Sequence, residues 1–213
     1  KAEGLLMSEH RENYLAASLS IDPNGSGDAA YSGTTEIRGR GNSTWEAPKK
    51  PYRLKLATKA PLLGMPSDRH WVLLANAFDP SHLRNELGLQ RSAQTGLQWT
   101  PRFRYGEVVL NGSYDGIYML GEHVRPASAR VDIDAMSEDD NSGEALTGGY
   151  LLEIDFRWNG AVDPGFASSD SVPVVVKEPE APTPVQLDYI RNYFNSFEAA
   201  VRSSSYQDPD VGY

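Results

Sequence analysis

The chain contains no cysteine, which excludes disulfides, thiol nucleophiles and cysteine-ligated metal sites. Its four histidines, His10, His70, His82 and His123, do not fall at the spacing of zinc ligands. Two catalytic signatures are also missing, namely the G-x-S-x-G turn that presents a nucleophilic serine and the G-x-x-x-x-G-K-[ST] phosphate loop. These absences argue against thiol enzymes, serine-triad hydrolases and ordinary P-loop enzymes.

Long apolar runs are absent too, since no stretch approaches the roughly 18–20 residues that cross a bilayer. The 213 residues include 29 acidic and 20 basic side chains, which gives a net charge of −9. Nucleic-acid binding needs a broad basic surface, so it is not expected. The sequence begins with Lys1 instead of Met, which suggests a processed N-terminus from which a signal peptide was removed. Together with the lack of cysteine, this fits a secreted or cell-surface bacterial protein.

Positive charge is concentrated in one segment of this acidic chain, EIRGRGNSTWEAPKKPYRLKL, residues 36–56. Residues 34–42 and 51–56 are predicted to be strands, and apolar and basic side chains alternate in the second of them. The segment between them is predicted to be a turn. The basic side chains suit either a site for a phosphate or the solvated face of a strand pair.

The rest of the chain predicts an α+β fold with a mainly antiparallel sheet and packed helices. Asp79 and Pro80 are typical of a helix start, and Gly96 of its end. Asn111-Gly112 predicts a tight hairpin turn. The expected strands and hairpin are residues 70–76, 104–124, 148–155 and 172–179.

A final helix is predicted over residues 183–201. Thr183 and Gln186 form a capping box, with Pro184 in the first turn. Its apolar stripe requires a partner surface, so we expect the sequence to stop inside a larger domain and the fold to be incomplete. The stripe consists of Leu187, Ile190, Phe194, Phe197 and Val201.

Two polar loops allow more than one interpretation. Residues 21–28, IDPNGSGD, are typical of a hairpin loop but also place oxygen-bearing side chains at calcium-ligand spacing. Gly33 stands where the bidentate glutamate of a calcium loop is expected. Residues 137–145, SEDDNSGEA, suit a mobile solvated loop better than a metal site.

A strand, a glycine-containing turn and a second strand that carries a lysine form the layout with which kinase-like folds cover a nucleotide. Lys55 would neutralise phosphate charge, and Glu86 or Asp79 on the following helix would hold that lysine. Glu122, in the segment GEHV, would belong to a hinge that faces the adenine. The phosphate cover would comprise Arg38, Gly39, Arg40, Gly41, Asn42, Ser43 and Thr44.

The order of these blocks closely resembles the CotH family, which is named for a bacterial spore-coat protein. The blocks IRGRGNSTW, KKPYRLKL and GGYLLEID are the most specific, and the likeness runs from about residue 31 to residue 201. The resemblance implies an atypical protein-kinase-like fold that uses ATP and a divalent metal such as Mg²⁺ to phosphorylate serine residues of other proteins. Residues 1–124 would form an N-lobe-like part, and residues 125–213 the start of a C-lobe.

The chain departs from the family pattern in its catalytic carboxylates. The catalytic Asp and the metal-binding Asp, in a W-D-x-D-like motif, are expected after the last helix, and no such motif occurs. Asp132, Asp134 and Asp155 are possible substitutes, but they lie in expected strand positions. The sequence therefore also allows a second interpretation, in which the protein is a non-catalytic extracellular module for coat, wall or polysaccharide assembly.

Overall fold

The structure is a computed structural model that describes residues 13–210 and residue 212. The interpretations that involve Lys1 and His10 lie outside the described residues. The chain divides into two compact units, which we call unit 1 and unit 2. Unit 1 comprises the chain up to Val124 together with Ala129–Val131, and unit 2 comprises Arg125–Ser128 and the chain from Asp132 onward.

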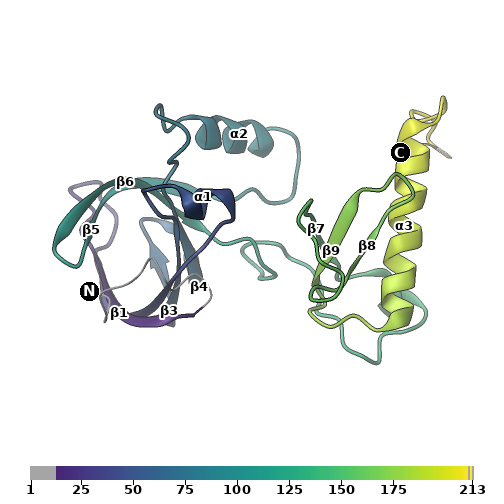
Figure 1. Ribbon diagram of the computed structural model, residues 1–213, viewed down its shortest axis with the longest axis horizontal. Helices are drawn as coiled ribbons and strands as arrows, with labels where there is room; N and C mark the ends of the chain where they lie inside the picture. Colours follow the sequence, from purple (N-terminus) through teal and green to yellow (C-terminus); the bar gives the residue numbers. More distant parts are fainter. Residues whose placement is uncertain (1–12, 211, 213) are drawn as a thin grey trace. The chain divides into compact units, whose positions relative to one another are not determined.

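Unit 1 is built on one curled, fully antiparallel sheet (Figure 1). Its strand order is β1-β2-β3-β4-β6-β5. The strands are β1 (Leu15–Ile21), β2 (Tyr31–Gly39), β3 (Tyr52–Leu62), β4 (Met65–Leu74), β5 (Phe103–Leu110) and β6 (Ser113–Glu122). Residues 22–30 join β1 to β2 as a hairpin loop, in which Asp22 accepts a hydrogen bond from the backbone N–H of Asn24.

Alternation along β3 explains why the sheet has a core face and a polar face. Tyr52, Leu54 and Leu56 are buried, whereas Arg53 and Lys55 between them point to the opposite face. The core face closes around the remaining buried side chains Ile37, Trp45, Leu62, Met65, Trp71, Leu73, Ala75, Tyr118 and Leu120. The basic side chains of β3 therefore lie on a face that the core leaves open.

The β5–β6 hairpin has the predicted turn. Asn111 and Gly112 both have positive φ, 51° and 89°, which is the backbone of the primed turn that asparagine and glycine favour. The two strands pair as far as Phe103 opposite Gly121. This pairing brings the start of β5 beside the end of β6.

Two short helices complete unit 1. The expected turn after β2 contains the one-turn helix α1 (Ser43–Glu46), whose Trp45 is buried. The prediction that Asp79 caps the next helix and Pro80 begins it is wrong, because α2 (Arg84–Ala93) begins four residues after Pro80, with Leu83 at its N-cap. Asp79 instead accepts hydrogen bonds from the backbone N–H groups of Ser81 and Arg84 and so stabilises the loop that leads into α2.

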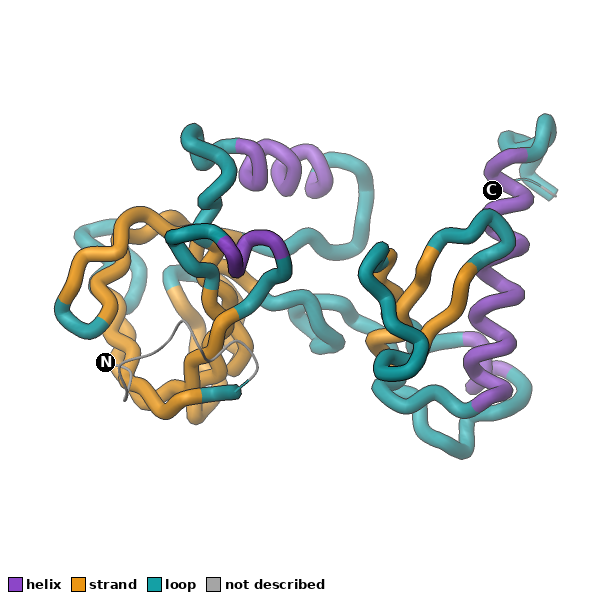
Figure 2. The backbone as a smooth tube through the Cα atoms, in the orientation of Figure 1, coloured by secondary structure: helices purple, strands orange, loops and turns teal. Residues whose placement is uncertain are grey.

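Unit 2 pairs a small sheet with the long helix α3 (Pro184–Arg202) (Figure 2). The sheet has the order β7-β9-β8, and η2 (Glu144–Thr147) precedes it. Its strands are β7 (Leu151–Ile154), β8 (Gly165–Ala167) and β9 (Pro173–Glu178), of which the sequence did not predict β8.

The predicted capping box of α3 is present. Thr183 Oγ1 accepts from the N–H of Gln186 at 3.2 Å, and the Gln186 side chain accepts from the N–H of Thr183 at 3.0 Å. The helix stripe packs on the sheet of its own unit, through Ile190 against the core residues Phe166 and Val174. The stripe thus has a partner surface in the described chain, although Val201 is 44% exposed.

The observed elements confirm an α+β fold with a mainly antiparallel sheet. None of the helices among residues 13–210 combines the length and apolarity that a membrane crossing requires.

Candidate functional site

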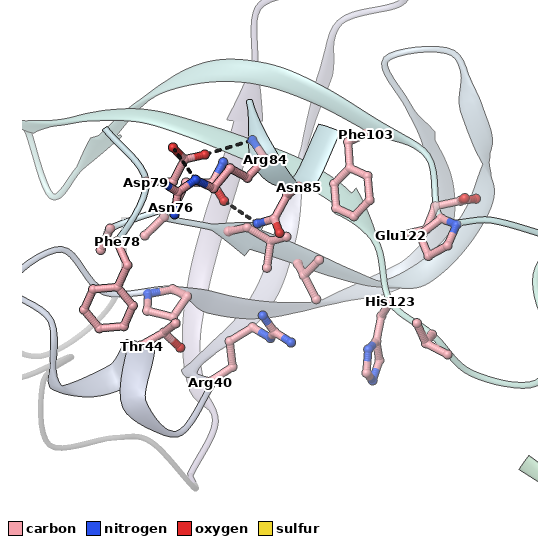
Figure 3. A pocket seen from close by; sticks show the side chains of 17 residues that line it. Arg40, Thr44, Asn76, Phe78, Asp79, Arg84, Asn85, Phe103, Glu122 and His123 are labelled. Carbon is pink, nitrogen blue, oxygen red and sulfur yellow. Dashed lines mark hydrogen bonds and ion pairs between the residues drawn. The ribbon is translucent and has the colours of Figure 1, made fainter. Parts of the chain in front are cut away.

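Unit 1 contains a cavity of about 510 Å³ where β4 and β6 end (Figure 3). Three segments that are distant in sequence meet at this cavity. They are the residues that follow β2, the loop between β4 and α2, and the residues at the end of β6. The first and third of these segments were predicted to cover and to hinge a nucleotide.

One wall of the cavity is apolar. Val72 and Leu74 share a face of β4 because side chains alternate along a strand. Phe103, at the start of β5, lies directly over Gly121. A Cβ atom on Gly121 would lie 2.0 Å from the Phe103 ring, so only glycine lets the ring approach the strand this closely. Val124 continues the apolar lining beyond β6.

Arg40 and Thr44 line the cavity from the glycine-containing segment. The two glycines beside them have packing roles. A Cβ atom on Gly39 would lie 2.3 Å from the ring of Trp45, and one on Gly41, at φ +85°, would lie 2.1 Å from Thr44 Oγ1. The glycines therefore let α1 fold against the end of β2, and this fold places Thr44 at the cavity.

The other predicted members of the phosphate cover lie beside the cavity and do not line it. Arg38 is on β2 opposite Arg53 of β3, and Asn42 and Ser43 stand at the start of α1. Of the predicted cover, the cavity thus receives the side chains of Arg40 and Thr44.

A second set of polar side chains, besides Arg40 and Thr44, comes from the loop before α2 and from the first turn of α2. Asn85 donates a hydrogen bond to Asn76 Oδ1 at 2.7 Å, and Arg84 Nε lies 3.8 Å from Asp79 Oδ1 (Figure 3). The hydroxyl of Ser81, followed by the N–H of Arg84, lowers the pKa of Asp79, so this carboxylate is ionised and engaged. Asn76 is engaged on both side-chain atoms, whereas Arg84 and Asn85 leave further polar atoms for a ligand.

Lys55 is not brought to its predicted helix partner. Its Nζ pairs with Glu36 of the neighbouring strand at 3.1 Å, and it also lies over the ring of Tyr14. Glu86 on α2 accepts a hydrogen bond from Gln90 at 3.0 Å. Burial and the neighbouring Glu86 raise the pKa of Tyr105 to about 12.

Glu122 lines the cavity, but its carboxylate is bound by Arg102. The Glu122 side chain is fully buried, and Arg102 approaches it with Nε at 2.9 Å and Nη2 at 2.7 Å. The backbone N–H of Arg102 adds a third hydrogen bond at 2.9 Å. The acid therefore fixes the start of β5 against the end of β6.

His123 also lines the cavity, and the sequence interpretation placed it in the hinge segment GEHV without a role for its side chain. Burial and, in decreasing order, the charges of Arg53, Arg40, His70 and Arg130 lower its pKa to about 2. The imidazole is therefore neutral at ordinary pH although several cations surround it. The signal in the sequence was the set of basic residues at alternate positions in β2 and β3, which place positive charge on one face.

The described residues do not fit a magnesium site. Within residues 13–210, no group of three or more His, Asp or Glu side chains is arranged so that it could hold a metal ion. Asp79 and Glu122 are the carboxylates that line the cavity, and hydrogen bonds occupy both. Asp155 accepts from the N–H of Arg157, and it lies in unit 2 together with Asp132 and Asp134.

Comparison with protein families places the chain with one family over most of its length. The family model described as CotH kinase protein matches residues 37–209. This range covers the cavity segments of unit 1 and most of unit 2. No curated protein matches the chain.

Proposed function

The chain belongs to the CotH kinase family, and on this premise we propose that unit 1 binds ATP in its cavity. Unit 1 would be the N-lobe-like part of an atypical protein-kinase-like domain, and residues 125–213 would begin its C-lobe-like part. The complete domain would transfer the terminal phosphoryl group to a Ser or Thr hydroxyl of a secreted, cell-surface or coat protein of a bacterium.

The main support for ATP binding is that an apolar wall and convergent polar groups share one cavity of about 510 Å³. Mostly apolar pockets with a few placed polar groups are typical of sites for small ligands. Val72, Leu74 and Phe103 offer the flat apolar contact that a purine ring needs. Arg40 offers paired N–H donors that match the oxygens of a phosphate.

Phosphate charge would be held on the side of the cavity where Arg40 and His123 lie, which is the lower edge of Figure 3. The hydroxyl of Thr44 is a further hydrogen-bond donor on the Arg40 segment. Arg84 and Asn85 line the opposite edge and could reach a ribose or a second phosphate. Lys55 is still predicted to add to the positive electrostatic potential near the cavity, since it lies on the same face of β3 as Arg53.

Phosphoryl transfer itself requires a carboxylate that orients the attacking hydroxyl and carboxylates that hold Mg²⁺ on the phosphates. The cavity carboxylates of unit 1 are already engaged, as described above. The proposed transfer therefore depends on acids that the cavity of unit 1 does not supply, and binding of ATP is the part of the function that its residues support.

A second candidate is a non-catalytic binding module associated with polysaccharide. Unit 2 has a groove of about 380 Å³ that is lined by Tyr150, Tyr189 and Tyr193. Successive ring centroids lie 6.0 and 6.4 Å apart at interplanar angles of 25° and 23°. Tyr193 is exposed and the other two rings are half-buried, and such nearly parallel rings along a groove favour contact with sugar faces.

Isothermal titration of the chain with ATP tests the proposed function. We expect Arg40→Ala to weaken ATP binding about 10- to 100-fold, as loss of a charge-assisted hydrogen bond does. Arg91→Ala is the matched control, because Arg91 is an exposed arginine of α2 that bonds Gln94 and does not line the cavity. Lys55→Ala measures whether the strand lysine contributes.

The absence of ATP binding at millimolar concentration in the folded protein would overturn the nucleotide proposal. Transfer of label from γ-labelled ATP to a Ser-containing protein would support the kinase function over that of a non-catalytic binding module. Binding of ATP without any transfer would leave the first unit a nucleotide binder, and titration with soluble oligosaccharides would then test the tyrosine groove.

A further inference from the structure

Five basic side chains of unit 1 converge beside the cavity. Arg40 follows β2, Arg53 lies on β3, His70 on β4 and His123 just after β6, while Arg130 comes from the segment that returns to unit 1. The His70 and His123 ring centroids are 6.4 Å apart. One Arg130 nitrogen donates hydrogen bonds to the backbone oxygens of both histidines at 2.7 Å.

The charges around His123 are of one sign. The groups that act on its imidazole are Arg53, Arg40, His70 and Arg130. Of the acids close to these residues in the fold, Glu122 is bound by Arg102, and Asp68 pairs with Arg130 of the cluster, with Oδ2 3.6 Å from Nε. Because an arginine stays protonated in proteins, a histidine is the group in this cluster that can exchange a proton near neutral pH.

An oxyanion that enters beside Arg40 changes this balance. Its negative charge opposes the repulsion that disfavours protonation of His123, and an opposite charge within a few ångströms favours the protonated imidazole. Protonation also turns the second ring nitrogen into a donor, which can then bond the anion. Anion and proton thus each favour binding of the other, as linkage requires.

We propose that His123 is a proton-linked anion-binding residue, so that a phosphate group enters the cavity beside Arg40 together with one proton on the His123 imidazole. The inference rests on the proposed function in that the phosphate belongs to ATP. The same chemistry would accept a free divalent oxyanion such as sulfate. Affinity for the anion then rises as the pH falls, by at most tenfold per pH unit for one proton taken up.

Calorimetry in two buffers of different ionisation enthalpy at pH 6.5 counts the protons taken up on binding. Sulfate is the first probe, because it does not itself titrate near this pH, and ATP is the second. With sulfate we expect proton uptake, loss of that uptake in His123→Gln, and its retention in His70→Gln. With ATP, whose terminal phosphate itself titrates near this pH, we expect the wild type and His70→Gln to take up more protons than His123→Gln. Uptake that is lost in His70→Gln and kept in His123→Gln would assign the proton to His70 and overturn the inference.

An NMR titration of the histidine ring signals of the wild-type protein tests, without a variant, whether His123 takes up the proton. The His123 signal should be constant between pH 5 and 8 in the free protein and should titrate when sulfate or ATP is bound. Constancy in the presence of a bound anion would also overturn the inference.

The two ligands keep the proposals apart. If sulfate binds with a proton and ATP does not bind, the anion site stands and the nucleotide proposal is lost. If ATP binds with the same proton change in the wild type and in His123→Gln, the nucleotide proposal stands and the role of His123 is wrong. If neither ligand binds the folded protein, both are wrong.

Discussion

Arg102 and Glu122 form a bidentate ion pair in which the carboxylate is fully buried and the arginine is 42% exposed. The pair joins the residue before β5 to the last residue of β6, and Arg102 Nη2 also donates to the backbone oxygen of Ala129 at 2.9 Å. The pair therefore holds together the segments that form one end of the cavity.

Arg102→Ala should lower the free energy of unfolding of unit 1 by about 3–5 kcal/mol, because it leaves a buried carboxylate without its partner. Urea unfolding followed by tryptophan fluorescence measures the change. Glu36→Gln is the control in the same unit, since the Lys55–Glu36 pair is 34% and 48% exposed and should be worth less than about 1 kcal/mol. Equal losses in the two variants would contradict the assigned role of Arg102.

The sequence correctly predicted features that depend only on residues close together in the chain. Asn111-Gly112 and the Thr183–Gln186 box each encode a local backbone geometry, and the structure confirms both. The Arg102–Glu122 pair joins positions 20 residues apart through strand pairing, so no local pattern indicated it. Glu122 was consequently predicted to face a nucleotide, whereas its carboxylate is occupied by Arg102.

Gly39→Ala should destabilise unit 1 by about 1–3 kcal/mol through overpacking. The new methyl group would lie 2.3 Å from the Trp45 ring, which is held in the core by its burial. Urea unfolding again measures the effect. Gly106→Ala on β5 is the matched control, because its Cβ would meet no atom within 4 Å. If Gly39→Ala impaired only ligand binding and left stability unchanged, its packing role would be wrong.

The glycine-rich segment shows where interpretation of the sequence reaches its limit. Glycines between strands suit both a phosphate cover and close packing of a small helix, and composition alone does not separate the two. The start of α2 was misplaced for a similar reason, because Asp79 binds backbone N–H groups in a loop as well as it caps a helix. The predicted pairing of Lys55 with Glu86 depended on where α2 lies relative to β3, and the sequence alone does not give that position.

The stability of unit 1 should fall as the pH is lowered below about 6.5, in part because of His123. Its pKa is about 2 in the fold and near 6.5 in an unfolded chain, so below pH 6.5 the unfolded state binds a proton that the native state does not. The stabilisation is complete above pH 6.5 and is lost progressively toward pH 2. At pH 5 the loss amounts to roughly 2 kcal/mol.

Urea unfolding of the wild type and of His123→Gln at pH 7.5 and pH 5 tests this linkage. The difference in stability between the two pH values should be smaller in the variant by roughly 2 kcal/mol. Taking the difference between proteins removes the contribution of the other titrating groups. An identical pH dependence in the two proteins would mean that the pKa of His123 is the same in the folded and unfolded states, which would contradict this prediction.

Gln186 should be the residue that holds the acidic loop 137–141 to α3. The side chain is fully buried, and Nε2 donates to the backbone oxygens of Ser137 at 2.7 Å and Asp140 at 3.2 Å. Gln186→Ala leaves these groups and the N–H of Thr183 without their partner, which should cost unit 2 about 2–4 kcal/mol. Gln186→Glu should cost at least as much, because a carboxylate would face two carbonyl oxygens.

Hydrogen exchange followed by mass spectrometry reports the effect of these changes on unit 2 by itself. The first turn of α3 and the loop should lose protection together in both Gln186 variants, because one side chain joins them. Gln207→Ala is the control, since Gln207 is an exposed residue of the same unit and should change stability by less than about 0.5 kcal/mol. If the loop lost protection while the first turn of α3 kept it, the capping box alone would start the helix, and Gln186 would serve only the loop.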